Sequence, residues 1–290
     1  MTSTPNPYLT RPKIRALLAD HGLEPSRALG QNFLCEPGLV DKIVRLGDVG
    51  HGDRVIEIGA GLGSLTVGLV VAGAEVMVVE LDRHIIPALE ETVAALAAAG
   101  YEGASRVEIH QGDALEFPWN EHLDGPAKVV ANLPYNIATP LILDLLASQP
   151  FLDTWLVMVQ REAGERLVAA PGSRIYGIPS VLVAYWADAS IVATVPADVF
   201  LPRPKVASVL VRLRRHQRQP TGCSFESLAA VVRSGFGQRR KMLRRSLAGL
   251  LTAEQIEQAG IAPTARAEEL GVDEWAKLAQ AASSGDNSGR

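Results

Sequence analysis

The sequence contains little cysteine, few aromatic residues and no long apolar run. Two cysteines, Cys35 and Cys223, are too few for a disulfide framework and lack the spacing of zinc ligands. No apolar stretch approaches the ~18 residues that a membrane helix needs, and residues 1–9 lack the charged start and apolar core of a signal peptide. With 47% hydrophobic residues and a net charge of −4 over 290 positions, the composition is not that of a disordered chain. We therefore expect a soluble, cytoplasmic protein with no membrane partner and no bound metal.

The small net charge hides an uneven distribution along the chain. Residues 1–199 contain 13 basic and 24 acidic side chains, whereas residues 200–250 contain 12 basic side chains and one acidic one, Glu226. Such a basic block indicates a partner that carries phosphates. The alternative is a charged face that contacts only solvent.

Short β-rich runs alternate with longer helical runs through the first two thirds of the chain. This alternation predicts an α/β fold with a Rossmann-like, mainly parallel sheet. The last two strands lack long helices between them, which permits an antiparallel edge. We expect strands over residues 54–58, 75–79, 106–109, 128–131, 154–159, 190–195 and 207–213, and helices over 64–71, 83–98 and 140–147.

The pattern changes after residue 213, where a polar stretch with a Pro–Thr–Gly turn is typical of a linker. The following residues predict helices over 225–235, 239–251, 252–260 and 273–282. We therefore expect a small all-helical C-terminal domain after the α/β domain. The expected parts are an N-terminal extension over 1–30, the α/β domain over 31–213, the helical domain over 214–282 and a disordered tail over 283–290.

A glycine-rich turn follows the first expected strand of the sheet. Gly59, Gly61 and Gly63 lead from that strand into a helix, and glycine there lets a ligand approach the backbone closely. Glu80 ends the next strand at the spacing expected of a carboxylate that binds ribose hydroxyls. Asp113 follows the third strand, where it could bind an adenine amino group or simply cap a helix. The alternating glycines resemble the cofactor loop of S-adenosylmethionine-dependent methyltransferases more than that of dehydrogenases.

The fourth expected strand ends in a second motif, Asn132-Leu133-Pro134-Tyr135. It resembles the Asn/Asp-Pro-Pro-Tyr/Phe motif of methyltransferases that modify an exocyclic amine. The Asn132 side-chain oxygen and the Leu133 carbonyl can accept the two N6 hydrogens of adenine, which directs the nitrogen lone pair toward a methyl donor. Pro134 restricts the turn, and the Tyr135 ring can stack on an extruded base. The alternative is an ordinary strand-to-loop turn.

Four further segments narrow the resemblance to one family. They are Leu29-Gly30-Gln31-Asn32-Phe33-Leu34 and residues 160–166, 200–208 and 236–243. Together with Asn-Leu-Pro-Tyr, they look like the ribosomal RNA adenine N6,N6-dimethyltransferase family, in its bacterial small-subunit form, over residues 25–280. The resemblance implies a monomeric enzyme that uses S-adenosyl-L-methionine. It would dimethylate two adjacent adenines in a hairpin loop near the 3′ end of small-subunit ribosomal RNA, during assembly of the small ribosomal subunit.

The resemblance also implies roles for individual residues. Those implied for the cofactor are Gln31, Asn32, Leu34, Gly59, Gly61, Glu80, Asp113, Ala114 and Asn132. The target base would be held by Asn132, Leu133, Pro134 and Tyr135, with Phe200 as a second aromatic face, although Phe200 could equally be a core residue. Phosphate contacts are expected from Arg203, Lys205, Arg239, Arg240, Lys241, Arg244 and Arg245, the last five on a predicted helix, where a solvated helix face is the alternative.

Three other functions remain open at this level. A related large-subunit ribosomal RNA methyltransferase shares the cofactor and catalytic motifs. A DNA adenine methyltransferase is less well supported, because no separate target-recognition region is evident. A non-catalytic ribosome-assembly factor on the same fold is the third. The sequence does not distinguish naked RNA from an assembled particle as substrate.

Overall fold

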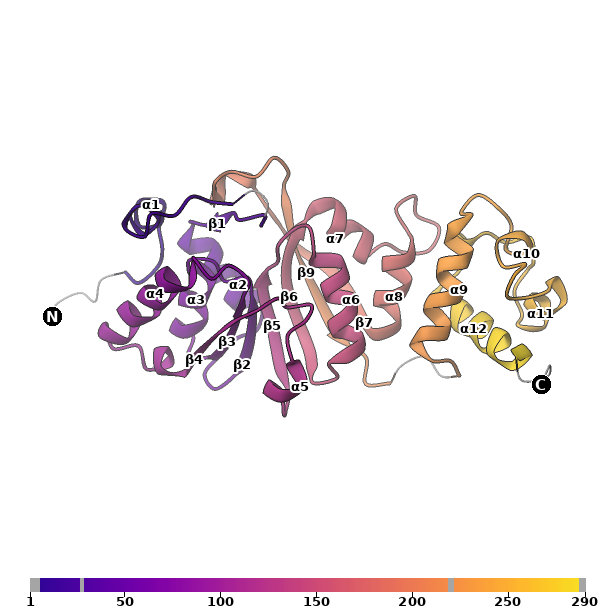
Figure 1. Ribbon diagram of the computed structural model, residues 1–290. Coiled ribbons are helices and arrows are strands. Elements are labelled where there is room, and N and C mark those ends of the chain that lie inside the picture. Colours follow the sequence, from indigo (N-terminus) through magenta and orange to yellow (C-terminus); the bar gives the residue numbers. More distant parts are fainter. Residues whose placement is uncertain (1–5, 27–28, 219–221, 287–290) are drawn as a thin grey trace. The chain divides into compact units, whose positions relative to one another are not determined.

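A seven-stranded sheet with helices packed against it dominates the computed structural model, which describes residues 6–26, 29–218 and 222–286 (Figure 1). The strand order is β4-β3-β2-β5-β6-β9-β7. The β2·β3, β3·β4, β2·β5 and β5·β6 pairs are parallel, and β9 runs antiparallel to β6. The strands are β2 (Arg54–Ile58), β3 (Glu75–Glu80), β4 (Val107–Gln111), β5 (Ala127–Asn132), β6 (Leu152–Gln160), β7 (Ala187–Val195) and β9 (Ser208–Arg215). The parallel sheet and its antiparallel pair are therefore confirmed.

Helices connect the parallel strands, as a βαβ arrangement requires. They are α3 (Ser64–Val71), α4 (Ile86–Ala98), the short α5 (Trp119–His122) and α6 (Ala138–Ser148), while α2 (Pro37–Leu46) precedes the first parallel strand. Helix α3 is buried at seven of its eight positions, Ser64 to Val70. Most of its residues are apolar, as a helix buried on nearly every side requires.

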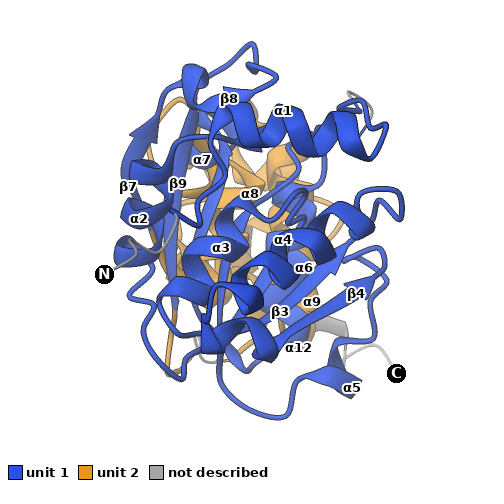
Figure 2. Ribbon diagram, turned by 90° about the vertical axis from the view of Figure 1, so that its left-hand side faces the viewer, with its two compact units in different colours: residues 1–164, 190–214 blue, residues 165–189, 215–290 orange. Residues whose placement is uncertain are grey.

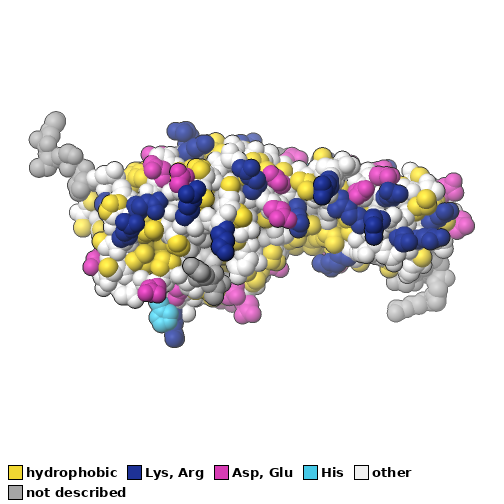
Figure 3. All heavy atoms as spheres, turned by 90° about the horizontal axis from the view of Figure 1, so that it is seen from above, with side chains coloured by type: hydrophobic (Ala, Val, Ile, Leu, Met, Phe, Trp, Pro, Cys, Tyr) yellow, Lys and Arg dark blue, Asp and Glu magenta, His cyan; other side chains and the backbone are white. Residues whose placement is uncertain are grey.

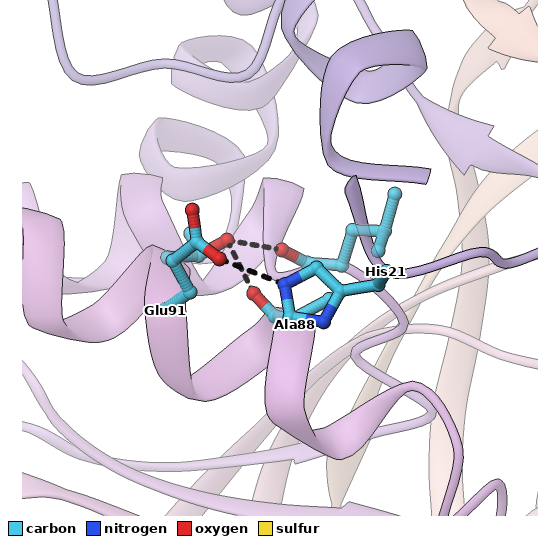
Figure 4. Close-up of polar contacts among 5 residues, drawn as sticks. His21, Ala88 and Glu91 are labelled. Atoms are coloured by element: carbon cyan, nitrogen blue, oxygen red, sulfur yellow. Dashed lines mark hydrogen bonds and ion pairs between the residues drawn. The ribbon is translucent and has the colours of Figure 1, made fainter. Parts of the chain in front are cut away.

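The described part of the N-terminal segment packs into the same core rather than extending from it. Helix α1 (Arg11–Asp20) buries Ile14 and Leu18, and Leu9 joins them in the main core cluster. Past α1, His21 Nε2 lies 2.7 Å from Glu91 Oε2 on α4 (Figure 4). The expectation that residues 1–30 form a separate extension therefore does not describe residues 6–26.

The chain divides into two compact units (Figure 2). Unit 1 comprises residues 1–164 and 190–214, and unit 2 comprises 165–189 and 215–290. The sequence did not indicate that residues 165–189, which include α8 (Ile178–Trp186), belong with the C-terminal helices. Helix α7 (Arg161–Leu167) spans the first division between the units.

Unit 2 is helical, with α9 (Phe225–Gly237), α10 (Leu243–Ser246), α11 (Ala253–Gln258) and α12 (Val272–Asp286). Trp275 of α12 is fully buried and lies against Gly235 of α9, where an added Cβ would come within 2.4 Å of its ring. A glycine at this position therefore allows α9 and α12 to approach closely.

Two expectations for this region are wrong. The predicted helix over 239–251 is interrupted, because Met242 forms a β-bridge with Arg266 and Leu243 N–H donates to the Ala265 carbonyl over 2.8 Å. These tertiary hydrogen bonds outweigh local helix propensity, and only the four-residue α10 remains. The tail expected to be disordered over 283–290 is helical through Asp286, and residues 287–290 lie outside the described residues.

Candidate functional site

The carboxyl ends of β2, β3 and β5, together with residues 29–34, line one pocket in unit 1. Parallel sheets place their ligand sites at this edge. The pocket brings together most of the residues that the sequence singled out: Gln31, Asn32, Leu34, Gly59, Gly61, Glu80, Asp113, Ala114, Asn132, Leu133, Pro134 and Tyr135. Phe200 is not among its lining residues.

The glycine turn holds the buried carboxylate of Glu80 in place. Gly61 N–H donates to Glu80 Oε2 over 2.9 Å, and Asp82 N–H donates to Oε1 over 3.0 Å. Gly61 has φ +57, and a Cβ there would lie 3.0 Å from the Phe33 ring. Burial raises the pKa of Glu80, although both backbone hydrogen bonds favour its charged form. Each carboxylate oxygen retains capacity to accept a further hydrogen bond from a hydroxyl group.

Asp113 both closes a turn and lines the pocket. Its Oδ1 accepts a hydrogen bond from Leu115 N–H over 2.9 Å. The next residue, Ala114, is buried at the pocket wall. The alternative of a helix cap is wrong, because a turn and not a helix follows Asp113. The second carboxylate oxygen is not needed for this turn and can accept a hydrogen bond, so the adenine-amino role stays a prediction.

Residues 29–34 are fastened to the sheet by the Gln31 side chain. Gln31 Nε2 donates to Asp82 Oδ2 over 2.8 Å, and its Oε1 accepts from Ser26 N–H over 2.7 Å. Both ends of this amide are therefore used within the protein. The sequence did not single out Asp82, although it follows Glu80 by two positions.

A threonine side chain of α4 is hydrogen-bonded to the backbone of the glycine turn. Thr92 Oγ1 is 2.9 Å from the Leu62 carbonyl and 3.0 Å from the Ala88 carbonyl, both in hydrogen-bond geometry (Figure 4). The Leu62 carbonyl belongs to the glycine turn, and the Ala88 carbonyl belongs to α4. This contact, with the His21–Glu91 pair beside it, holds α4 against the segments that border the pocket.

Asn132 is oriented by a contact with the N-terminal segment. Its Nδ2 donates to the Asn32 carbonyl over 3.3 Å, which leaves Oδ1 as the side-chain atom free to accept a hydrogen bond. Leu133 N–H donates to the Met158 carbonyl over 3.1 Å, and Pro134 packs against Gly59. The motif is therefore held by the neighbouring strand and by the glycine turn.

Tyr135 is half-buried, and its Oη lies 2.8 Å from Ser208 Oγ on β9. Burial raises the pKa of the tyrosine. Phe200 differs from its expected role, since its ring has no exposed surface. It belongs to the core cluster, and its strand β8 (Phe200–Leu201) pairs with β1 (Phe33–Leu34). This pairing turns the ring into the core, which is the alternative that the sequence left open.

Three polar residues of the pocket received no role from the sequence: Glu57, Ser64 and Asn136. Glu57 is buried and accepts a hydrogen bond from Thr66 Oγ1 over 2.6 Å, and burial raises its pKa to about 8. Ser64 Oγ is buried at the start of α3 with no hydrogen-bond partner among the described residues. A carboxyl group inside an apolar strand was the available signal for Glu57, and nothing local distinguished Ser64.

The basic residues fall into two groups, described separately for each unit. Arg203 and Lys205 of unit 1 are exposed, and so are Arg240, Lys241, Arg244 and Arg245 of unit 2. On the face seen in Figure 3, unit 2 carries a group of Lys and Arg side chains. Arg239 differs, because its Nε donates to Glu268 Oε2 over 2.8 Å and its guanidinium also donates to the Arg174 carbonyl. Its charge is already paired within unit 2.

The described residues contain neither a metal-binding cluster nor a membrane-spanning helix. Among them, no group of three or more His, Cys, Asp or Glu residues is arranged to hold a metal ion. Within the same residues, no helix has the length and apolar character needed to cross a membrane.

Comparison with known proteins places the chain among ribosomal RNA methyltransferases. Residues 24–283 match the protein family described as Ribosomal RNA adenine dimethylase. Proteins named Ribosomal RNA small subunit methyltransferase A are similar over nearly their whole length. The one from Cutibacterium acnes is 44% identical over 92% of both chains, and the one from Thermobifida fusca is 43% identical over 94% of this chain and 95% of the relative.

Solved structures show the same fold. A dimethyladenosine transferase from Plasmodium falciparum superimposes with a TM-score of 0.72 at 26% identity, covering 85% of this chain and 95% of that one. The 23S rRNA methyltransferase ErmE gives a TM-score of 0.65 at 24% identity, covering 87% of this chain and all of the other, and this likeness bears on the fold alone.

Proposed function

Because the chain belongs to the ribosomal RNA adenine dimethylase family of S-adenosylmethionine-dependent methyltransferases, we propose which RNA it modifies and which residues do so. The proposed substrate is small-subunit ribosomal RNA, modified twice at N6 of each of two adjacent adenines in a hairpin loop near the 3′ end. The enzyme would act in the cytoplasm during assembly of the small subunit. The proposed substrate is supported by the relatives named Ribosomal RNA small subunit methyltransferase A. The observation that carries the residue roles is Asn132 Oδ1, which has no hydrogen-bond partner among the described residues and belongs to a side chain that lines the same pocket as Glu80 and Asp113.

The pocket residues match the polar groups of the cofactor. Glu80, held by the Gly61 and Asp82 amides, would accept hydrogen bonds from the two ribose hydroxyls. Asp113 would accept one from the adenine amino group. The hydroxyl donors would also offset the cost of keeping the Glu80 carboxylate charged in a buried position.

The target base would be held by the Asn132–Tyr135 turn. Asn132 Oδ1 and the Leu133 carbonyl would accept the two N6 hydrogens, so that the nitrogen loses conjugation with the ring and its lone pair becomes available. Tyr135 would stack on the flipped base. These groups act by position and by hydrogen bonding, and no strong general base is required.

The bound cofactor supplies a methyl group on a positively charged sulfur. Asn132 Oδ1 and the Leu133 carbonyl would direct N6 toward that methyl carbon, so that a carbon–nitrogen bond could form while the carbon–sulfur bond breaks and leaves its electron pair on sulfur. The same two acceptors would face the positive charge that N6 would then carry. Its proton is then acidic enough to leave to water. Repetition on the monomethylated base gives dimethyladenosine.

The exposed basic side chains would contribute affinity through phosphate contacts rather than sequence choice. Arg203 and Lys205 would do so beside the active site, and Arg240, Lys241, Arg244 and Arg245 would do so on unit 2. Arg239 is withdrawn from this set because of its ion pair with Glu268.

The test is transfer of labelled methyl groups to unmethylated small subunits, large subunits and duplex DNA, with analysis of the released nucleosides. Dimethyladenosine from small subunits alone, lost in Asn132→Ala, is the expected result. Label in large-subunit RNA would show instead that the protein is a large-subunit ribosomal RNA methyltransferase. Absence of transfer to every substrate by a protein that still binds the cofactor would point to a non-catalytic assembly factor.

A further inference from the structure

Ser208 ends the 200–208 segment but has no role assigned above, yet its hydroxyl contacts the aromatic residue of the catalytic turn. Ser208 Oγ and Tyr135 Oη are 2.8 Å apart. Ser208 has no exposed surface, and Tyr135 is half-buried with its ring at the pocket. The hydroxyl end of the ring is therefore anchored inside the protein, and the remainder of the side chain lies at the pocket wall.

The anchor is attached to a rigid part of the sheet. Ser208 is the first residue of β9 and pairs with Gln160 of β6 in the antiparallel ladder. Just before it, the Ala207 carbonyl accepts from Arg161 N–H over 3.0 Å. The exposed residues Arg203, Lys205 and Val206 precede this point, so Ser208 is where the exposed loop becomes part of the sheet.

A tyrosine side chain has two rotatable bonds, and fixing its hydroxyl restricts both. The Tyr135 side chain is held at its backbone by the turn and at its hydroxyl by the hydrogen bond to Ser208 on β9. A ring held in one plane loses less conformational freedom when a base stacks on it. Ser208 is fully buried and Tyr135 is half-buried, so removal of the tyrosine hydroxyl leaves a buried serine hydroxyl without this partner.

We propose that Ser208 is a positioning residue for methyl transfer, which holds the Tyr135 ring in the plane on which the target adenine stacks. This inference rests on the proposed function, in which Tyr135 contacts the base. Ser208 itself touches neither the base nor the cofactor. Its removal should slow transfer without weakening cofactor binding.

The experiment compares four proteins in single-turnover methylation of small subunits: wild type, Ser208→Ala, Tyr135→Phe and the double variant. Tyr135→Phe is the matched partner, because it keeps the ring and removes the same hydrogen bond from the other side. We expect each single variant to lose about three- to tenfold in rate. The double variant should lose no more than either single variant, since the one bond is already gone.

Two further measurements separate positioning from a general loss of structure. The affinity for S-adenosylhomocysteine, measured by calorimetry, should stay within about twofold of wild type in all three variants. In addition, the double variant should unfold at a higher temperature than Tyr135→Phe, because that single variant leaves the buried Ser208 hydroxyl unpaired.

The outcomes are distinct. An active wild type with an equally active Ser208→Ala variant overturns the inference and leaves the proposed function standing. Multiplicative losses in the double variant overturn it as well, because Ser208 and Tyr135 would then act separately. A wild type that methylates no small-subunit RNA overturns the proposed function and, with it, this role for Ser208.

Discussion

The side-chain amide of Asn132 donates to the backbone carbonyl of Asn32 over 3.3 Å, so that a residue at the end of β5 is oriented by a segment that begins the α/β fold. The two residues are 100 positions apart in the chain. This contact determines which end of the Asn132 amide faces the pocket, and with it the ability to accept a hydrogen bond from an amine.

Asn132→Asp should therefore impair the enzyme although a carboxylate accepts hydrogen bonds well. The substituted side chain has no N–H for the Asn32 carbonyl, and its second oxygen would be repelled by that carbonyl. We expect a loss of about tenfold or more in the single-turnover rate. Asn120→Asp, an exposed change of the same kind on α5, is the control and should leave the rate unchanged. A fully active Asn132→Asp would show that the Asn32 contact is dispensable.

Gly61 and Gly22 form a matched pair for testing the glycine turn. Both have left-handed backbone, with φ +57 and +60, but an added Cβ meets the Phe33 ring only at Gly61. Gly22→Ala should cost about 1–2 kcal/mol of unfolding free energy from backbone strain alone. Gly61→Ala should cost roughly 1–3 kcal/mol more because Phe33 must move. Urea unfolding measures both, and equal losses would mean that the Phe33 contact carries no cost.

Glu57 should make stability depend on pH. Its pKa is about 8 in the folded protein against an ordinary value of 4.5, so the folded state binds the proton more tightly than the unfolded chain. This contribution is complete below pH 4.5 and is lost as the pH rises through about 8. Glu57→Gln removes this pH-dependent loss of stability, because glutamine does not titrate. The unfolding free energy of the variant relative to wild type should rise over this interval, by on the order of a few kcal/mol, and level off above it.

Thr66→Val provides the control for that titration. The Thr66 hydroxyl donates to Glu57 and favours its charged form. Its removal should raise the pKa of Glu57 further and extend the pH-dependent loss of stability to higher pH. A pH profile of the unfolding free energy that is unaltered in both variants would show that Glu57 does not titrate in this range.

Arg239 and Arg240 are neighbours with different expected effects. Arg239 pairs with Glu268 within unit 2, so Arg239→Ala should lower the unfolding free energy by about 1 kcal/mol, a value that allows for the partial exposure of the pair. Arg240 is exposed, and Arg240→Ala should leave stability unchanged.

The RNA-binding measurement for the same pair is the slope of log affinity against log salt concentration. If Arg240 contacts one phosphate, Arg240→Ala should reduce that slope by about 0.7–0.9. Arg239→Ala should leave it unaltered. The reverse pattern would mean that the Arg239–Glu268 pair opens when RNA binds.

The seven strands of the main sheet, the glycine turn and the Asn-Leu-Pro-Tyr turn could be predicted from local sequence, whereas the β1–β8 pair could not. Apolar runs of the right length mark buried parallel strands, and carboxyl or amide residues directly after them must meet at one edge of the sheet. The positions of Glu80, Asp113 and Asn132 in one pocket follow from that rule, because the geometry of a parallel sheet leaves them no other place.

Tertiary structure alone decided which side chains face the pocket, which are buried in the core and where a predicted helix is interrupted. The break at Met242 depends on hydrogen bonds to residues 263–266, the burial of Phe200 on its pairing with Leu34, and the anchoring of Tyr135 on Ser208. Each involves partners distant in the chain, and local propensity carries no information about a partner that only folding brings near. The sequence by itself therefore determined the chemistry of the pocket residues, whereas long-range packing determined their orientation.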